Sequence, residues 1–247
     1  MTLEQPGHAS MDAKQTTVPR HIGIILDGNR RFAKRLMLKP WKGHEWGAKK
    51  LSSVLAWCRE LGVQEVTIYA FSIENFNRPK EEFDELMRIF KDECERMLND
   101  TKLEADRDVR ISFIGRTWMF PATLQTAINA VQDKTASYGP FKLNLAMAYG
   151  GRAEVIDATK KLATMVKEGT LAIDQINEDV FAKQLYIESE PDLIIRTSGE
   201  QRTSGFLLWQ GSYAELYFCE KLWPEFEKED LHKAIATFTQ RERRFGK

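Results

Sequence analysis

The sequence predicts a single α/β domain built on a mainly parallel, six-stranded sheet flanked by helices. From residue 21 onward, short apolar runs alternate with longer segments of helical periodicity, the pattern of a parallel sheet covered by helices. The length of 247 residues lies in the range where α/β folds form one domain. After residue 20 the sequence contains no repeat, low-complexity tract or linker, which also favours one domain.

Six apolar runs of strand length follow one another along the chain. The predicted strands comprise residues 22–26, 66–71, 109–114, 143–148, 193–196 and 216–218. Ligands of open α/β sheets bind at the carboxyl ends of the strands, where loops and helix N-termini converge. The candidates for function are therefore the polar segments that directly follow strands, at residues 27–31, 72–78 and 196–204.

Apolar residues between the strands recur at helical spacing. The first stripe runs from Ala48 to Leu61 and stops at Gly62, a residue typical of helix ends. The second helix is predicted to open near Asn77 and Pro79, with acidic residues in its first turn. Its apolar stripe comprises Phe83, Leu86, Met87, Phe90, Cys94 and Met97. Later helices are predicted over residues 121–137, 152–168 and 229–241.

The composition narrows the classes of function. Basic and acidic residues number 36 each, so the molecule as a whole has no field that attracts nucleic acid or anionic lipid. Any anion binding must come from local clusters. The four scattered histidines give no zinc spacing, so a metal must rest on carboxylate oxygens, which favours magnesium over zinc.

The cysteines and the N-terminal segment indicate the cellular compartment in which the protein is expected. Cys58, Cys94 and Cys219 are far apart in apolar patterns, which predicts reduced core residues in a cytoplasmic protein. Residues 1–18 are polar and predict a flexible tail, followed by one folded domain over residues 19–247. Because no apolar run reaches the length of a signal peptide or membrane span, any membrane contact is expected to be peripheral.

The first polar segment is Asp27-Gly-Asn-Arg-Arg31. A carboxylate directly after a buried strand is well held, and Gly28 and Asn29 suit a tight turn whose N–H groups can face a phosphate. Arg30 and Arg31 would add charge-assisted contacts to that anion. The alternative is an Asp N-cap followed by a solvated, basic helix start, and the local sequence leaves both open.

The second segment is Ser72-Ile-Glu-Asn-Phe-Asn-Arg78, again between a strand and a helix. Asn75 and Arg78 are well suited to orient a diphosphate or a nearby proton. The alternative is a loop rich in capping residues with no role in binding.

The third segment follows the fifth strand. Arg196, Arg202 and Ser204 on a glycine-containing loop can form an oxyanion clamp, because guanidinium groups bind phosphate oxygens in a forked geometry. Glu215 could give a metal a second oxygen ligand. The alternative for the arginines is surface salt bridging to acidic neighbours such as Glu200.

Together these segments closely resemble the cis-prenyltransferase family, which includes undecaprenyl diphosphate synthase. The resemblance covers nearly the whole chain from residue 21 with its motifs in the family's order. The matching elements include Asp27-Gly-Asn-Arg-Arg31, Gly43-His44, Tyr69-Ala-Phe-Ser-Ile-Glu-Asn75, Asn77-Arg-Pro79, Tyr149-Gly-Gly-Arg152, Asp192-Leu-Ile-Ile-Arg196, Phe206-Leu-Leu-Trp-Gln210, Tyr213-Ala-Glu-Leu-Tyr217 and Arg241-Glu-Arg-Arg-Phe-Gly246.

The resemblance implies roles for individual residues. Asp27 and Asn75 would be catalytic, and Asp27 and Glu215 would hold Mg²⁺. The allylic diphosphate would contact Gly28, Asn29, Arg30, Arg31, Phe32 and His44. The substrate pocket would be lined by Ser72, Ile73, Glu74, Phe76 and Arg78, and isopentenyl diphosphate would bind Arg196, Arg202, Thr203 and Ser204.

The resemblance also implies the reaction. A cis-prenyltransferase condenses isopentenyl diphosphate with an allylic prenyl diphosphate, and a glycosyl-carrier lipid precursor would be the product. It further implies a homodimer, with the tail at Arg244–Gly246 reaching towards substrate, and product release at a membrane surface. The small Ala70 leaves room for a medium or long product. Candidates for an apolar tunnel are Phe83, Leu86, Met87, Phe90, Ile114 and Leu145, although for each residue taken singly the pattern favours ordinary core, because any packed helix shows an apolar stripe.

The sequence departs from the family pattern at a few positions. Pro40 stands where relatives often have an arginine that contacts the allylic diphosphate, although Lys39 and Lys42 flank it. Phe76 replaces a common tryptophan, and Gln201 and Gly205 replace residues often seen as His and Asn. These changes keep open a coupling other than head-to-tail.

Two further alternatives remain. A non-catalytic subunit that scaffolds an active partner usually lacks the aspartate and parts of the basic clamp, but this chain retains Asp27, Arg196 and Arg202. A nucleotide-binding α/β enzyme is disfavoured, because the sequence has neither G-x-G-x-x-G nor a P-loop lysine motif.

Overall fold

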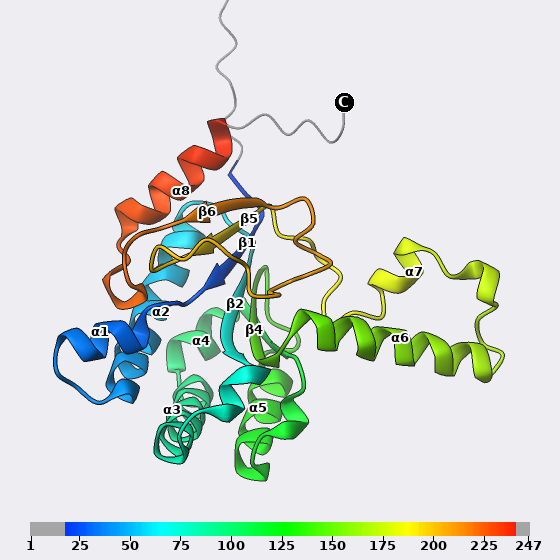
Figure 1. Ribbon diagram of the computed structural model, residues 1–247, viewed down its shortest axis with the longest axis horizontal. Coiled ribbons are helices and arrows are strands. Elements are labelled where there is room, and N and C mark those ends of the chain that lie inside the picture. Colours follow the sequence, from blue (N-terminus) through cyan, green and yellow to red (C-terminus); the bar gives the residue numbers. More distant parts are fainter. Residues whose placement is uncertain (1–17, 241–247) are drawn as a thin grey trace, which may run out of the picture.

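The computed structural model describes residues 18–240. One sheet of six parallel strands, in the order β3-β4-β2-β1-β5-β6, forms its centre (Figure 1). The strands are β1 (His21–Ile25), β2 (Glu65–Ser72), β3 (Val109–Ile114), β4 (Phe141–Tyr149), β5 (Leu193–Arg196) and β6 (Glu215–Phe218). The predicted single domain and parallel sheet are confirmed. The prediction was possible because strands of a parallel sheet are buried on both faces and therefore form continuous apolar runs.

Helices connect and cover the strands. They are α1 (Asn29–Arg35), α2 (Pro40–Glu60), α3 (Lys80–Leu98), α4 (Thr101–Asp106), α5 (Ala122–Thr135), α6 (Gly151–Lys167), α7 (Glu178–Ala182) and α8 (Lys228–Gln240). Short 3₁₀ turns are η1 (Ile73–Asn77), η2 (Thr117–Met119), η3 (Ile173–Gln175) and η4 (Trp223–Glu225). The five predicted helices are α2, α3, α5, α6 and α8, whereas α1, α4 and α7 are too short for apolar periodicity to reveal.

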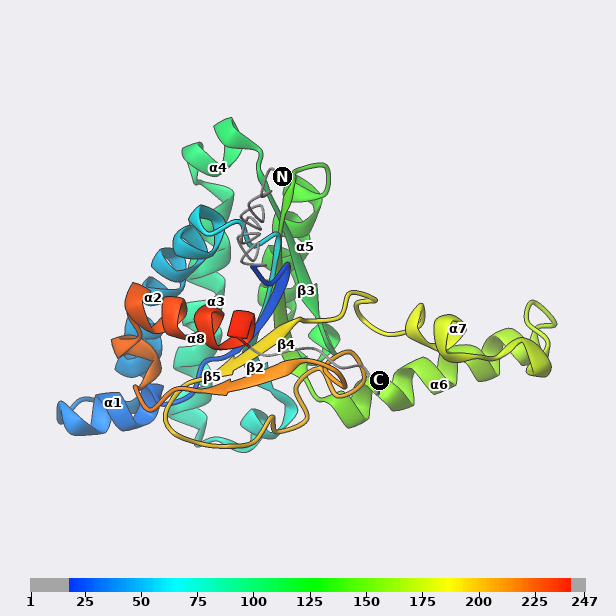
Figure 2. The ribbon, with the colours of Figure 1, turned by 90° about the horizontal axis from the view of Figure 1, so that it is seen from above.

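The larger hydrophobic core lies between one face of the sheet and the helices α2, α3, α5 and α8. Helix residues buried in it include Val54, Leu86, Ile128 and Leu231. A smaller cluster on the other face contains Tyr69 and Tyr149 from the strands and Phe206 from the segment after β5. Helix α6 begins at this face and, with α7, extends away from the sheet (Figures 1 and 2).

Helices α1 and α2 pack closely because two glycines of α2, which have no side chain, face the start of α1. A Cβ atom at Gly43 would lie 1.9 Å from the carbonyl oxygen of Asn29, and one at Gly47 would lie 2.5 Å from its Oδ1. Larger residues at these positions would therefore push α1 away from α2. This close packing fixes the start of α1, and with it Asn29, against the body of the domain.

Strand β2 contains an irregularity at Ala70. Tyr69 pairs with Ala146 and Phe71 with the next residue, Met147, so Ala70 is an extra residue in β2. As a consequence, Ala70 and Phe71 both pack on the side of the larger core. The bulge brings the small side chain of Ala70 to the same face as α2 and α3.

Four predictions concern the remaining parts of the chain. Cys58, Cys94 and Cys219 are buried and unpaired, as predicted for reduced core residues. Within residues 18–240, none of the helices combines the length and apolar character required to cross a bilayer. The tail predicted over residues 1–18 lies outside the described residues except for Val18, which packs against the core. The motif at 244–246 also lies outside them.

Candidate active site

Asp27 lies just beyond β1, and the neighbouring strand β5 holds its backbone. The N–H of Asp27 donates to Oγ1 of Thr197 at 3.0 Å, and that hydroxyl donates to the Asp27 carbonyl oxygen at 2.7 Å. The N-cap of α1 is Gly28, whose φ of 104° favours glycine. The alternative in which Asp27 caps this helix is therefore wrong, and the carboxylate points elsewhere.

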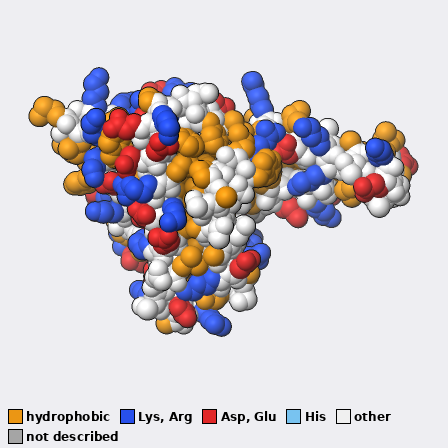
Figure 3. All heavy atoms as spheres, turned by 90° about the horizontal axis from the view of Figure 1, so that it is seen from below, with side chains coloured by type: hydrophobic (Ala, Val, Ile, Leu, Met, Phe, Trp, Pro, Cys, Tyr) orange, Lys and Arg blue, Asp and Glu red, His pale blue; other side chains and the backbone are white. Residues whose placement is uncertain are grey.

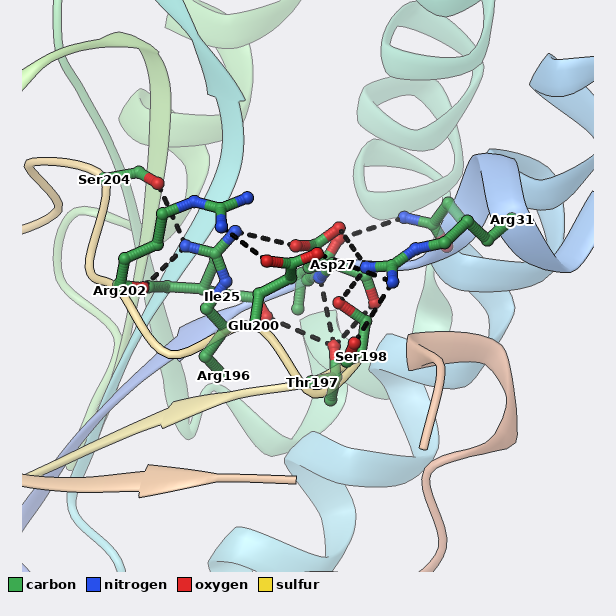
Figure 4. A network of polar contacts seen from close by, with 11 residues as sticks. Ile25, Asp27, Arg31, Arg196, Thr197, Ser198, Glu200, Arg202 and Ser204 are labelled. Carbon is green, nitrogen blue, oxygen red and sulfur yellow. Dashed lines mark hydrogen bonds and ion pairs between the residues drawn. The ribbon is translucent and has the colours of Figure 1, made fainter. Parts of the chain in front are cut away.

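Two guanidinium groups flank the Asp27 carboxylate (Figure 4). Nη2 of Arg196 donates to Oδ2 at 2.7 Å, and Nη2 of Arg31 lies 3.5 Å from Oδ1. Burial alone would raise the pKa of Asp27, but the hydrogen bond and charge of Arg196, assisted by Ser198, outweigh it. The pKa of Asp27 is therefore below its ordinary value, and the carboxylate is ionised at neutral pH.

Arg196 ends β5 and connects Asp27 to the loop that follows. Its side chain is 6% exposed, and its Nη1 donates to the Arg202 carbonyl oxygen at 2.6 Å and to Oγ of Ser204 at 2.9 Å. Its buried Nε has no hydrogen-bond partner among the described residues. Because buried donors are normally paired, this unpaired N–H group of a guanidinium fits a site that binds an oxyanion.

Glu200 links two exposed arginines on the outer side of this cluster. Its carboxylate pairs with Arg202 and lies 3.7 Å from Arg31. Arg31 also donates to the hydroxyl of Ser198 and, at 3.2 Å, to its carbonyl oxygen. The salt bridge considered as the alternative role of Arg202 is thus present. It holds the arginines at the mouth of the site without excluding a role in binding.

A second basic cluster surrounds Glu82 on α3, a residue that the sequence reading did not select. Its carboxylate is buried and lies 2.9 Å from Nη1 of Arg78, 3.5 Å from Nε of Arg30 and 3.8 Å from Nε2 of His44. Contact with His44 is the largest influence that lowers the pKa of Glu82, and the two arginines add to it. One carboxylate thus positions three predicted binding residues that come from separate elements.

His44 is neutral within this cluster. Burial is the main reason that its pKa is lowered, although Glu82 acts in the opposite direction. Nη1 of Arg78 lies 3.0 Å from Nε2 of His44, and the same ring nitrogen lies 3.8 Å from the Glu82 carboxylate. As a neutral imidazole at the cavity, His44 has one N–H group to donate.

The second polar segment forms the turn η1, and Asn75 stabilises it. Oδ1 of Asn75 accepts the backbone N–H of Ser72 at 3.2 Å. The capping role considered as the alternative is therefore present, and the amide N–H₂ group of Asn75 lies beside the cavity. Phe76 packs instead against Phe71 and Phe120, in an aromatic cluster next to the turn.

A cavity of ≈ 670 Å³ begins at these polar clusters and continues between the sheet and helices α2 and α3. Predicted site residues that line it are Asp27, Asn29, His44, Ser72, Glu74, Asn75, Arg78, Arg196, Arg202 and Ser204. Its apolar part is lined by Leu51 and Leu55 of α2, Phe90 and Met97 of α3, and Ala70 of β2. A charged mouth thus leads into an apolar interior.

Other predicted site residues lie outside the lining. They are Gly28, Arg30, Arg31, Phe32, Ile73, Phe76, Thr203 and Glu215. Arg30 and Arg31 still contact residues that line the cavity, Arg31 through Asp27 and Arg30 through the Glu82 cluster. Phe32 is buried and its ring packs on Trp46 at 5.5 Å.

The tunnel candidates separate into two groups. Phe90 and Leu145 line the cavity. Leu86 and Met87 are buried in the larger core, and Phe83 packs against it. Ile114 lies in the smaller cluster on the other face of the sheet, whereas its neighbour Phe113 lines the cavity. Alternation along a strand does not by itself show which of two neighbouring residues faces the cavity.

Glu215 lies far from Asp27 within the chain. It pairs with Leu193, which pairs with Ile22 near the amino end of β1, whereas Asp27 follows the carboxyl end. Three residues along the strand and two strand spacings across the sheet separate Glu215 from Ile25. Standard strand geometry makes this distance about 14 Å. The two carboxylates of one chain therefore cannot share one ion, and the Glu215 prediction requires a second chain.

The residues at Asp27 fit a magnesium ion that phosphate oxygens help to hold. Mg²⁺ prefers hard oxygen ligands and is commonly held by one or two carboxylates, waters and substrate phosphates. Asp27 offers an ionised, partly exposed carboxylate at the cavity mouth. No group of three or more metal-binding side chains occurs within residues 18–240, so most ligands of such an ion would come from the substrate and water.

Thr197, Ser198 and Glu82 are the site residues that sequence reasoning missed. Thr197 and Ser198 lie in the predicted segment 196–204, but only the side chains expected to clamp an oxyanion were selected from it, and these two were not among them. Glu82 lies four residues after Arg78, one helical turn away, and this spacing was the available signal.

The comparisons with known proteins agree with this geometry. The family model described as "Putative undecaprenyl diphosphate synthase" matches residues 25–246. A tritrans,polycis-undecaprenyl-diphosphate synthase (geranylgeranyl-diphosphate specific) of Methanopyrus kandleri is 48% identical over 236 residues, covering 95% of this chain and 87% of the relative. An isoprenyl transferase of Thermus thermophilus is 45% identical, covering 96% and 92%.

Solved structures show the same similarity. Lavandulyl diphosphate synthase from Lavandula x intermedia, in complex with dimethylallyl diphosphate, superposes with a TM-score of 0.87 at 37% identity, covering 93% of this chain and 99% of that one. A probable undecaprenyl diphosphate synthase from Campylobacter jejuni gives a TM-score of 0.77 at 32% identity, covering 94% and 100%.

Proposed function

The chain belongs to the cis-prenyltransferase family and transfers prenyl groups, and from this premise we propose that it condenses isopentenyl diphosphate with an allylic prenyl diphosphate. The product would be a medium- or long-chain Z-polyprenyl diphosphate. The observation that carries this proposal is the ionised Asp27, held between arginines at the mouth of a cavity with an apolar interior.

The two basic clusters suit two diphosphates. We assign isopentenyl diphosphate to Arg196, Arg202 and Ser204, where the forked guanidinium groups and the spare Arg196 Nε donor can meet phosphate oxygens. We assign the allylic diphosphate to the start of α1 and to His44. The first N–H groups of a helix have no partner within it, and His44 adds a donor.

The proposed chemistry follows from charge. The allylic carbon–oxygen bond breaks, the diphosphate leaves with the electron pair, and the isopentenyl double bond attacks the resulting cation. Loss of a proton from the isopentenyl unit restores a double bond in the product. Fixed arginines stabilise the negative charge on the leaving diphosphate. Asp27 and the phosphate oxygens would hold Mg²⁺, which when bound would neutralise part of that charge.

Asn75 and the cavity serve the later part of the reaction. Asn75 is held at the cavity by its bond to Ser72, so its amide group would lie near the proton that is lost. The apolar interior would take up the growing chain. Helix α2 lines the cavity from His44 to Leu55, about 16 Å of helix, which gives a chain room to lengthen beyond one condensation.

An incorporation assay tests this function. Purified protein with magnesium and labelled isopentenyl diphosphate is combined with a series of allylic primers, from dimethylallyl to geranylgeranyl diphosphate. We expect a butanol-extractable product ladder, and its loss when EDTA removes the magnesium. Absence of incorporation with every primer, with or without magnesium, would reject the proposed reaction.

Replacing Ala70 by Leu should shorten the product. The added carbons would project from the bulge of β2 into the cavity, where the chain grows, while the diphosphate clusters stay intact. Product length by thin-layer chromatography measures the effect. Ala56→Leu, on the exposed face of α2, is the matched control and should keep the wild-type ladder. An unchanged ladder in Ala70→Leu would show that the chain does not pass this residue.

Coupling other than head-to-tail is the second candidate. The similarity to lavandulyl diphosphate synthase, with Pro40 at the start of α2, favours it. The lysines beside Pro40 are not free to take over the diphosphate contact of the arginine that relatives often have at this position. Lys42 pairs with Glu45 at 2.9 Å, and Lys39 lies 3.8 Å from Glu81. The assay separates the two, since coupling of dimethylallyl diphosphate without isopentenyl diphosphate would support this second reaction.

The remaining family expectations complete the proposal. A scaffold role is disfavoured by the intact cluster around Asp27. We propose a homodimer in the cytoplasm, whose product serves as a glycosyl-carrier lipid precursor. Because such a product is apolar, its release calls for contact with a membrane surface, while nucleic acid has no part in the reaction.

A further inference from the structure

The turn between α1 and α2 exposes three consecutive aliphatic side chains, which we call the apolar tip (residues 36–38). Met37 is 94% exposed, and Leu36 and Leu38 are each 43% exposed. Figures 1 and 2 place the turn at the periphery of the molecule, away from the sheet. Such a run of exposed aliphatic residues has no role in the core of the domain.

The backbone holds the tip in place. The N–H of Met37 donates to the carbonyl oxygen of Lys34 at 3.0 Å, and that of Leu38 donates to Ala33 at 2.9 Å. Met37 has a φ of 57°, a conformation that non-glycine residues adopt rarely. The tip is therefore part of a defined turn, with its side chains directed outward.

Basic residues concentrate around the tip. Residues 30–50 contain eight lysines and arginines and one acidic residue, although the whole chain has no net charge. Six of the eight lie within 4 Å of an acidic side chain, as Arg35 does with Glu225 and Lys42 with Glu45. Lys34 and Lys49 are exposed and have no acidic partner in the part of the chain that the structure describes. Figure 3 shows hydrophobic and basic side chains together at the edge where α1 and α2 lie.

An exposed tryptophan extends this surface along α2. Trp46 is 52% exposed, and its ring packs on Phe32 of α1 at 5.5 Å. Lys42, Trp46 and Lys49 follow one another at spacings of four and three residues, which puts them on one face of the helix. Tryptophan beside lysine is a combination favoured at the boundary between lipid and water.

We propose that the apolar tip and this face of α2 dock the protein on an anionic lipid bilayer. Insertion of a small apolar element combined with attraction of lysines to anionic headgroups is the established physics of interfacial binding. An exposed apolar tip with the unpaired Lys34 beside it and the unpaired Lys49 on the adjoining helix suits a soft, negatively charged surface better than the flat, charge-depleted core of a protein interface. Local positive charge gives the attraction that the neutral chain as a whole lacks.

The position of α2 relates docking to the reaction. Leu51 and Leu55 of the same helix line the cavity, so docking through α2 would put the wall of the proposed chain tunnel next to lipid. This part of the argument rests on the proposed function. Binding to lipid, however, can be measured without turnover, so the two proposals can fail separately.

Vesicle sedimentation of the full chain tests the docking. We expect wild-type protein to bind vesicles of phosphatidylcholine with phosphatidylglycerol, to bind pure phosphatidylcholine far less, and to be released by salt. Met37→Asp should weaken binding to the anionic vesicles about tenfold or more, because a charge would enter the apolar layer. Lys34→Glu should weaken it several-fold. Incorporation in detergent solution should be unchanged in both variants.

The matched control is Ile173→Asp, at a residue 75% exposed in η3 and far along the chain, which should bind as wild type does. Equal binding by Met37→Asp and wild type, equal loss in Ile173→Asp, or equal binding to neutral vesicles would each overturn the proposal. So would loss of a dimer in Met37→Asp on gel filtration, which would assign the tip to a protein contact. Failure of incorporation in wild type would affect only the proposed reaction.

Discussion

Asp27→Ala is expected to reduce turnover by a factor on the order of 10³ or more while the protein remains folded. The substitution removes the ionised carboxylate at the cavity mouth and with it the proposed ligand of magnesium. It also removes the partner of Arg196, whose side chain is nearly buried, at a cost of about 1–3 kcal/mol of unfolding free energy. Single-turnover incorporation and thermal unfolding measure the two effects separately.

A matched variant distinguishes loss of chemistry from loss of stability. Asp157 makes a two-pronged pair with Arg116, at 2.7 and 2.9 Å, away from the cavity. Asp157→Ala should therefore destabilise the protein to a similar degree but retain turnover. Near-normal turnover in Asp27→Ala would contradict the mechanism, and so would an equal loss in both variants.

Arg196→Lys should lower kcat/KM for isopentenyl diphosphate about 100-fold. A lysine retains the charge, but one ammonium group cannot at once reach Asp27, the Arg202 carbonyl oxygen and a phosphate. Each lost charge-assisted hydrogen bond costs about 1.5–3 kcal/mol. Steady-state kinetics with either substrate varied should show the larger effect in the isopentenyl diphosphate series.

The same substitution at Arg116 provides the control. Arg116→Lys loses a forked pair with Asp157 but touches no residue that lines the cavity, so its kinetics should match wild type. If Arg196→Lys kept wild-type kcat/KM for isopentenyl diphosphate, the assignment of that diphosphate to Arg196 would have to be abandoned.

Much of the site could be predicted because parallel strands end at one edge. Asp27 follows β1 and Arg196 ends β5, and since these strands are neighbours, residues 169 positions apart meet at 2.7 Å. The order of strands was not predicted, so the direct pairing of Asp27 with Arg196 was not foreseen. Apolar runs identify buried strands, but they do not say which strands pair.

Other features depend on contacts between distant segments. Glu82 appeared to be one of several acidic residues in a helical first turn, and only the fold brings His44 and Arg30 to it. The extra residue at Ala70 shifts the alternation of β2, and no local pattern signalled that shift. The short helix α1 was considered only as an alternative, because seven residues carry too little periodicity.

If diphosphates bind as proposed, the bridge from Glu200 to Arg31 and Arg202 makes their capture an exchange of anions. In the absence of substrate, these guanidinium groups already have a carboxylate counterion, so an arriving diphosphate must displace it. Part of the gross attraction is thereby cancelled, which keeps the net affinity moderate. When inorganic diphosphate departs, Glu200 can return to the same arginines. For the proposed series of condensations, this tethered carboxylate would help the arginines to release diphosphate after every cycle.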